Sequence, residues 1–121
     1  MPNYMQGRSI LPLCEGSTPN DWTDLAYHRY WMNNDSCHQA RAHYGIRTHT
    51  HKLIYWYYDP LGQPGAREDF LEPEWELFDL ENDPLELCNV ACDEAYSETF
   101  ELMKHKLEAE MNRIGDIPVH P

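Results

Sequence analysis

Cysteines are the side chains of this sequence with the greatest capacity for chemistry. The four cysteines lie at positions 14, 37, 88 and 92, with neither a Cys-x-x-Cys pair nor a zinc-finger spacing. We therefore predict no structural zinc site. Cys88 and Cys92 could be joined in a disulfide if the turn between them brings their β-carbons close. Free buried thiols are the alternative.

Two histidines and four tryptophans are the next candidates for a functional site. His49 and His51 would share one face of a strand and could hold a transition metal, but at a hairpin turn they would be two exposed histidines. No third ligand is near in the sequence, so we predict no metal-binding residue. The tryptophans could stack on sugar rings, although aromatic residues at strand spacing are more often core or interface. The sequence has no Gly-rich phosphate loop and no Gly-x-Ser-x-Gly elbow, which leaves nucleotide and serine-hydrolase functions unsupported.

Length and charge restrict the class of protein further. The 121 residues suffice for one small domain, and 25% charged with 41% hydrophobic residues indicates a folded chain. A net charge of −12 repels phosphates and argues against a nucleic-acid partner. No apolar run approaches the roughly 20 residues that cross a bilayer, so we expect no membrane partner. The first residues lack an apolar signal core, so we expect no export signal in this chain and leave its localisation unknown.

Hydrophobic periodicity predicts the elements that would position any site. Alternation with a period of two predicts strands at residues 25–31, 44–48, 52–58 and 75–80. A short turn near His49 and Thr50 joins the second strand to the third. Residues 5–14 should form a helical turn that Pro12 stops.

One long helix is predicted at the C-terminal end. Asp93 can cap its start and Gly115 can end it. Its apolar residues recur at steps of three and four, at Tyr96, Phe100, Met103, Leu107, Met111 and Ile114. Before it, Asp83 should cap a helical turn that begins at Pro84.

Both faces of the predicted sheet carry apolar or aromatic residues. The third strand, for example, has Leu53, Tyr55 and Tyr57 on one face and Ile54, Trp56 and Tyr58 on the other. An antiparallel sheet with one solvated face should instead alternate apolar with polar residues. A single helix covers only one face, and an exposed aromatic patch normally marks an interface. We therefore hypothesise that the second face packs against another domain.

Several phrases of the sequence are similar, in their order, to one known family. They are Met-Gln-Gly-Arg-Ser-Ile-Leu-Pro-Leu at 5–13, Tyr-His-Arg-Tyr-Trp at 27–31, His-Tyr-Gly-Ile-Arg-Thr at 43–48 with Lys-Leu-Ile-Tyr at 52–55, and Leu-Phe-Asp-Leu-Glu-Asn-Asp-Pro at 77–84 followed by Glu86 and Asn89. Together they resemble the C-terminal subdomain of the type I, formylglycine-dependent sulfatases that act on sulfated sugars.

The resemblance implies an α+β fold, a four-stranded antiparallel sheet packed by one C-terminal helix, as in alkaline-phosphatase-like sulfatases. Residues 1–24 would be the end of the catalytic-domain segment and a linker, and residues 25–121 the C-terminal subdomain. The chain would then be a C-terminal fragment of a sulfuric ester hydrolase that packs on the catalytic domain and lines its substrate pocket. The alternative is a free-standing carbohydrate- or protein-binding module derived from a sulfatase.

The chemistry of the family depends on groups that this sequence lacks. The nucleophile is a cysteine in Cys-x-Pro/Ala-Ser-Arg, oxidised to formylglycine, and calcium balances the charge of the sulfate. The nearest match here, Cys37-His-Gln-Ala-Arg41, lacks the defining residues. We therefore expect no catalytic residue, calcium or formylglycine in this chain, and no sulfate-ester hydrolysis by it alone. Full-length family members are usually exported to the periplasm, the extracellular space or lysosomes.

The resemblance also implies three substrate-binding residues. In family members the loop between the first two strands faces the active-site cleft, and the matching positions are His38, with His43 and Arg47 on the following strand. Histidine and arginine suit a sulfated carbohydrate because they donate hydrogen bonds to hydroxyls or to a sulfate. Two alternatives stay open: Arg47 pairs with an acidic residue on a neighbouring strand, and His43 is a hydrogen-bonded group of the core.

Overall fold

The computed structural model describes residues 5–69 and 71–117. They form the predicted α+β fold, with one antiparallel sheet in the strand order β1-β2-β3-β4. The strands are β1 Ala26–Tyr30, β2 His43–Arg47, β3 His51–Trp56 and β4 Glu74–Asp79. Each predicted strand is present, with its ends shifted by one or two residues.

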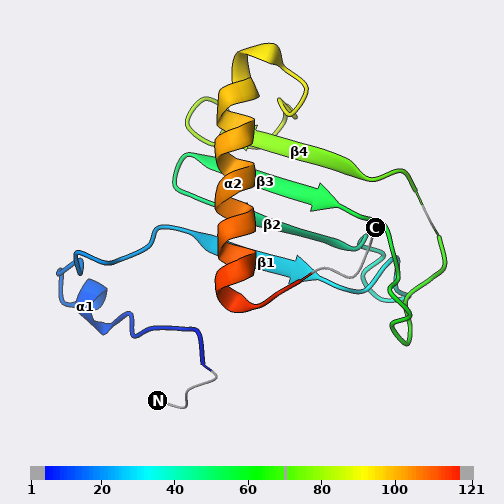
Figure 1. Cartoon of the computed structure of the whole chain (residues 1–121), viewed down its shortest axis with the longest axis horizontal. Helices are drawn as coiled ribbons and strands as arrows, with labels where there is room; N and C mark the ends of the chain where they lie inside the picture. The colour runs from blue at the N-terminus through cyan, green and yellow to red at the C-terminus, as the bar shows by residue number, and fades with distance from the viewer. Residues whose placement is uncertain (1–4, 70, 118–121) are drawn as a thin grey trace.

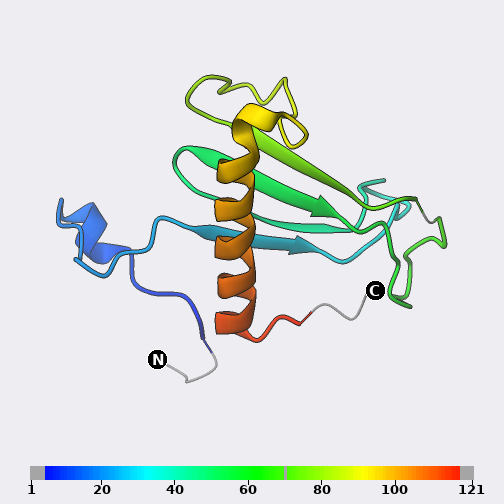
Figure 2. The ribbon, with the colours of Figure 1, turned by 45° about the horizontal axis from the view of Figure 1, so that its top comes forward.

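The helices are α1 Leu11–Cys14, the short 3-10 helix η1 Glu94–Tyr96, and α2 Ser97–Ile114. Figures 1 and 2 show that α2 crosses one face of the sheet, whereas α1 lies away from the sheet in the N-terminal segment. No helix in the described ranges has the length and apolar character that a membrane span requires.

The hydrophobic core lies between α2 and the sheet. Met103, Leu107 and Met111 of α2 are buried, as the predicted stripe requires. They pack with the fully buried strand residues Ile46, Leu53 and Leu77. Burying an aliphatic side chain stabilises the fold by about 1.5–3 kcal/mol, so this contact layer holds α2 to the sheet.

The ends of the C-terminal helix follow the prediction closely. The side chain of Asp93 accepts a hydrogen bond from the backbone of Ala95 at 2.9 Å, and this cap begins η1, which continues into α2. Gly115 ends α2 with φ at 73°, a conformation that costs glycine little. The backbone N–H of Asp116 then donates to the carbonyl of Met111 at 3.0 Å and closes the cap.

Two predicted helical turns were wrong in detail. Pro12 lies in the first turn of α1, where its missing N–H is unneeded, so it helps to begin this helix and does not stop it. Pro84 follows Asp83 in a hydrogen-bonded turn, and residues 80–90 contain no helix. Asp83 does cap backbone groups, because its side chain accepts from the N–H groups of Leu87 at 2.6 Å and Cys88 at 2.8 Å.

The cysteines also differ from the prediction. All four are free and exposed, so Cys88 and Cys92 form no disulfide, and the alternative of buried thiols is wrong as well.

The hairpin turn between β2 and β3 is where the sequence placed it. The backbone N–H of Thr48 donates to the carbonyl of His51 at 2.9 Å. His49 is exposed and its Nε2 lies 3.2 Å from the carboxylate of Asp24. Within the described ranges, no group of three or more metal-ligating side chains is found.

The face of the sheet opposite α2 is not the bare apolar surface that the sequence analysis predicted. Trp56 donates from Nε1 to Glu76 at 2.7 Å, and the hydroxyl of Tyr58 donates to Glu74. The ammonium of Lys52 lies 5.2 Å from the ring centroid of Phe78. Among the described residues, none of the exposed large hydrophobic side chains belongs to a strand.

The reason for this error is physical. The pattern counted tryptophan and tyrosine rings as surface that needs burial, but the polar atoms of Trp56 and Tyr58 bond neighbouring carboxylates, and Ile54, Tyr58 and Phe78 are already buried within the chain. These contacts remove the bare apolar patch from which the hypothesis was inferred, and the packing of this face on another domain stays a prediction.

The outer edge of β4 is covered by the chain itself. Asn89 accepts from the backbone N–H of Leu77 at 3.0 Å and donates to the carbonyl of Trp75 at 3.1 Å. Beside it, the N–H of Val90 donates to the carbonyl of Leu77 at 2.9 Å. The edge groups of the strand thus have partners in the following loop.

Candidate functional site

Histidine and aromatic rings gather on the sheet face opposite α2, and we call this group the histidine face: His28, Tyr30, His43 and Trp56. His43 is paired across the strands with Tyr30 of β1 and with Trp56 of β3. Its ring centroid lies 4.3 Å from that of Trp56, 5.8 Å from that of Tyr30 and 5.5 Å from that of His28. The result is a continuous surface of rings that carry hydrogen-bonding nitrogens and a hydroxyl.

Gly45 makes room for His28 on this face. The two residues are directly opposite in the pairing of β1 with β2. A Cβ at position 45 would lie 2.9 Å from Cε1 of His28 and 2.3 Å from the backbone oxygen of Leu53. Burial lowers the pKa of His28 because it disfavours the charged form of the ring, and the nearby His43 and Lys52 act in the same direction.

His38 lies on the loop between β1 and β2, beside the histidine face. Its side chain is 72% exposed, and its Nδ1 lies 3.3 Å from Oδ1 of Asp35. The ring of Tyr30 is 6.3 Å away, edge to face. Tyr30 in turn donates its hydroxyl to Oδ2 of Asp35, so one carboxylate ties the loop histidine to the sheet.

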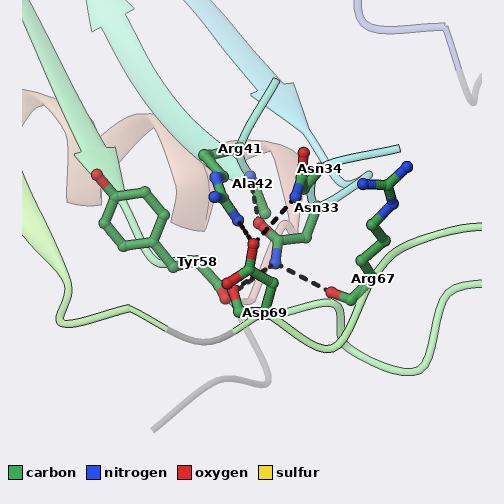
Figure 3. Close-up of polar contacts among 7 residues, drawn as sticks. All are labelled: Asn33, Asn34, Arg41, Ala42, Tyr58, Arg67 and Asp69. Atoms are coloured by element: carbon green, nitrogen blue, oxygen red, sulfur yellow. Dashed lines mark hydrogen bonds and ion pairs between the residues drawn. The ribbon is translucent and has the colours of Figure 1, made fainter. Parts of the chain in front are cut away.

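Asn33 holds this loop against the rest of the fold. Its side chain is fully buried, and its Nδ2 donates to the carbonyls of Tyr58 and Arg67 at 3.2 Å and of Asp69 at 3.1 Å. Its Oδ1 accepts from the backbone N–H of Ala42 at 3.3 Å. Figure 3 shows the amide at the centre of these segments, with only the backbone of Arg67 turned toward it.

A second group of contacts reinforces the same junction. Asp69 accepts from Nδ2 of Asn34 at 3.0 Å and from the guanidinium of Arg41 at 2.5 Å, which lowers the pKa of Asp69 (Figure 3). Asn34, Gln39 and Tyr58 adopt positive φ angles of 50°, 54° and 52°. Such angles are costly for residues other than glycine, so this bonded network is what keeps the loop in shape.

The structure brings two of the three predicted substrate residues together. His38 and His43 both contact the Tyr30 ring, with centroids 6.3 Å and 5.8 Å from it. His43 also bonds the backbone oxygen of Arg41 through Nδ1 at 2.7 Å, so it has a structural partner. Whether these residues contact a substrate stays a prediction.

Arg47 lies apart from the two histidines. It is four residues along β2 from His43, a distance of about 13 Å on a strand. Its guanidinium lies 3.6 Å from Glu86, an acidic residue of the loop after β4, and it lines a pocket of about 290 Å³ with Asp24 and His49. Arg47 therefore pairs with an acidic residue, as the alternative prediction stated, although that residue lies on a loop and not on a neighbouring strand.

The side-chain oxygen atoms near the histidine face do not fit a calcium ion. Calcium takes six to eight oxygen ligands, yet the carboxylates of Asp35 and Asp69 already accept hydrogen bonds from Tyr30, His38 and Arg41. The described residues offer no other cluster of ligands.

This arrangement of sheet, helix and loop is shared with alkaline-phosphatase-like sulfatases. A solved structure in complex with its substrate, D-glucosamine-2-N,6-O-disulfate, aligns with a TM-score of 0.79 and 31% identity, over 96% of this chain and 21% of that chain. The phosphonate monoester hydrolase of Agrobacterium radiobacter aligns with a TM-score of 0.63 over 89% of this chain and 21% of its own, and at 24% identity it shows the fold alone.

The sequence comparisons identify the family. A family model described as N-sulphoglucosamine sulphohydrolase, C-terminal, matches residues 1–113, and the chain belongs to this family of sulfatase C-terminal domains. It is 32% identical over 118 residues to N-acetylglucosamine-6-O-sulfatase of Bacteroides thetaiotaomicron, covering 96% of this chain and 19% of that protein. It is 27% identical over 120 residues to arylsulfatase K of Rattus norvegicus, covering 98% of this chain and 18% of that protein. The chain thus spans about a fifth of the length of these relatives.

Proposed function

We propose that the chain is the C-terminal part of a sulfatase for sulfated sugars, that it packs on a catalytic domain and lines the substrate pocket, and that it is inactive without that domain. The observation that carries this proposal is its membership of a C-terminal domain family while it covers only about a fifth of related sulfatases. The nucleophile motif of such enzymes, Cys-x-Pro/Ala-Ser-Arg, does not occur in the 121 residues.

The surface that would pack on the catalytic domain is the N-terminal segment. Met5, Ile10, Leu11 and Leu13 are 36–64% exposed, which is a high density of uncovered apolar side chains. The segment stands away from the sheet in both views of the fold (Figures 1 and 2). This supports the proposal that residues 1–24 are the end of the catalytic-domain segment and a linker; residues 1–4 lie outside the described part.

The residue that would reach the substrate is His38. It is exposed on a loop whose backbone is fixed by buried hydrogen bonds, so its position is well defined before a ligand arrives. The nearby His43 would be a second donor, and Arg47 would contact only an extended substrate, since it lies at the far end of β2. The proposed substrate class is supported by the name of one relative, N-acetylglucosamine-6-O-sulfatase.

A chimera tests the proposal. The chain would replace the matching C-terminal part of the Bacteroides relative, and N-acetylglucosamine-6-sulfate would be the substrate. We expect activity from the chimera, a raised KM in its His38→Ala variant, and loss of soluble assembly when Ile10 and Leu13 are changed to aspartate. Turnover of an aryl sulfate with calcium by the chain alone would contradict the proposal. Tight binding of the sulfated sugar by the chain alone, with an inactive chimera, would favour the free-standing module.

A further inference from the structure

Asp35 is the residue on which the contacts of His38 converge. It is only 6% exposed. Its Oδ1 accepts from the backbone N–H groups of Cys37 at 2.8 Å and His38 at 3.0 Å, and it faces Nδ1 of His38 at 3.3 Å. Its Oδ2 accepts from the hydroxyl of Tyr30. One carboxylate therefore connects β1, the loop backbone and the exposed imidazole.

The chemistry of this carboxylate decides which nitrogen of His38 carries a proton. Hydrogen bonds from Tyr30 and from the backbone of His38 and Cys37 lower the pKa of Asp35 well below its usual range. An ionised carboxylate can only accept hydrogen bonds, so the Nδ1 that faces it must be the donor. In the neutral imidazole the proton is then on Nδ1, and Nε2 is the free nitrogen.

We propose that Asp35 is a positioning residue, which fixes the proton on Nδ1 of His38 and thereby presents Nε2 to a sulfated sugar. The part of this proposal that concerns the sugar rests on the proposed function. Neutral His38 accepts a hydrogen bond from a sugar hydroxyl at Nε2, and protonated His38 donates from the same atom to a sulfate oxygen. In both states Nε2 is the contacting atom, because Asp35 holds Nδ1.

The geometry also explains why an exposed side chain would be ready to bind. A histidine that is 72% exposed would normally sample several rotamers and both neutral tautomers. The bond to Asp35 removes this freedom in the unbound chain, and Tyr30 prevents the carboxylate from turning away. Preorganisation of this kind lowers the cost of binding without adding a contact to the ligand.

Nitrogen NMR of the imidazole rings tests the positioning directly, without ligand. At a pH where His38 is neutral, we expect its spectrum to show the Nδ1–H tautomer in the unmodified chain. The Asp35→Asn variant should shift His38 to the Nε2–H tautomer that an unconstrained histidine side chain prefers in water. The matched control is Asp24→Asn, which removes the carboxylate beside His49 and should leave His38 unchanged.

The unmodified chain provides a test that needs no variant to fold. If its His38 shows the Nε2–H tautomer, the proposal is wrong. A Tyr30→Phe variant separates the contributions further, because it keeps the carboxylate. We expect it to retain the Nδ1–H tautomer, and equal loss of this tautomer in Tyr30→Phe and Asp35→Asn would show that the loop as a whole, and not Asp35, determines the tautomer.

Titration of the chimera, made inactive at its nucleophile, with N-acetylglucosamine-6-sulfate separates this inference from the proposed function. We expect Asp35→Asn and His38→Ala each to raise the Kd about tenfold, the effect of about one hydrogen bond, and the double variant to lose no more than either single one. Additive losses would overturn the claim that Asp35 acts through His38. Failure of the chimera that carries the unmodified chain to bind contradicts the proposed function, and the tautomer measurement then decides the role of Asp35 alone.

Discussion

Arg29 and Asp116 form a largely buried ion pair between β1 and the segment that follows α2. Their side chains are 8% and 20% exposed, and the hydroxyl of Tyr27 donates to the same carboxylate. The guanidinium lies 5.9 Å from the ring centroid of Tyr44 and 5.7 Å from that of Tyr57. An acidic residue is unfavourable beyond the C-terminal end of a helix, so this pair explains why one is found there.

Removal of Asp116 should destabilise the fold strongly. Asp116→Ala leaves the Arg29 charge buried without its counter-ion, which costs about 3–5 kcal/mol. The measurement is urea unfolding at pH 7. The matched control is Asp21→Ala, which breaks an exposed pair with Arg8 and should change the unfolding midpoint little. Similar effects of the two substitutions would show that the Arg29–Asp116 pair is solvated in solution.

Gly45 should not tolerate a side chain. In Gly45→Ala the new Cβ would meet the backbone oxygen of Leu53 at 2.3 Å, and β2 and β3 would have to separate. We expect a loss of about 1–3 kcal/mol in the free energy of unfolding, which thermal unfolding can measure. Gly7→Ala is the control, because a Cβ at position 7 meets nothing within 4 Å. An unchanged Tm in Gly45→Ala would contradict the described packing of the two strands.

Asp79 should make the fold sensitive to acid. Hydrogen bonds from Asn82, Tyr96 and the backbone of Glu81 and Asn82 lower its pKa to about 2. Since the folded pKa lies below the unfolded one, the stabilisation is present above about pH 4 and is lost as the pH falls toward 2. Asp79→Asn should be less stable at pH 7 and should show a smaller loss of stability between pH 4 and pH 2. The measurement is the unfolding midpoint across this range, and an unchanged slope would refute the assignment.

Asn33 should control the mobility of the loop that carries His38. Asn33→Ala removes the hydrogen-bond donor of the carbonyls of Tyr58, Arg67 and Asp69. A buried group left unsatisfied lowers the free energy of unfolding by about 1–3 kcal/mol. Relative to the unmodified chain, we expect Asn33→Ala to accelerate amide hydrogen exchange more in residues 33–42 than in β3. Asn112→Ala, at an exposed position of α2, is the control. If exchange accelerates equally throughout the sheet, Asn33 acts on global stability and not on the loop.

The fold was predictable because its elements have clear periods. Alternation placed the strands, and steps of three and four placed α2, which follows the η1 turn capped by Asp93 and ends at Gly115. The second face was mispredicted because a pattern of rings does not reveal that Trp56 and Tyr58 bond glutamates of β4. Those pairs form only across the sheet, between residues 16 and 20 positions apart.

The candidate site was predictable only in part. The resemblance to sulfatases nominated His38 and His43, but Asp35 and Asn33 were missed. The contacts of Asn33 join residues 25–36 positions apart, so its role depends on the folded path of two loops. The polar run Asn33–Ser36 was a signal for side-chain-capped turns, and Asp35 does bond the backbone of Cys37 in this way.

Asn89 has a consequence for how molecules of this protein meet one another. By occupying the outward-facing N–H of Leu77 and carbonyl of Trp75, its amide removes two of the backbone groups on which a foreign strand could align. Lateral growth of the sheet into fibrils is thereby blocked on the β4 side, and Asn89→Ala would open that route to aggregation.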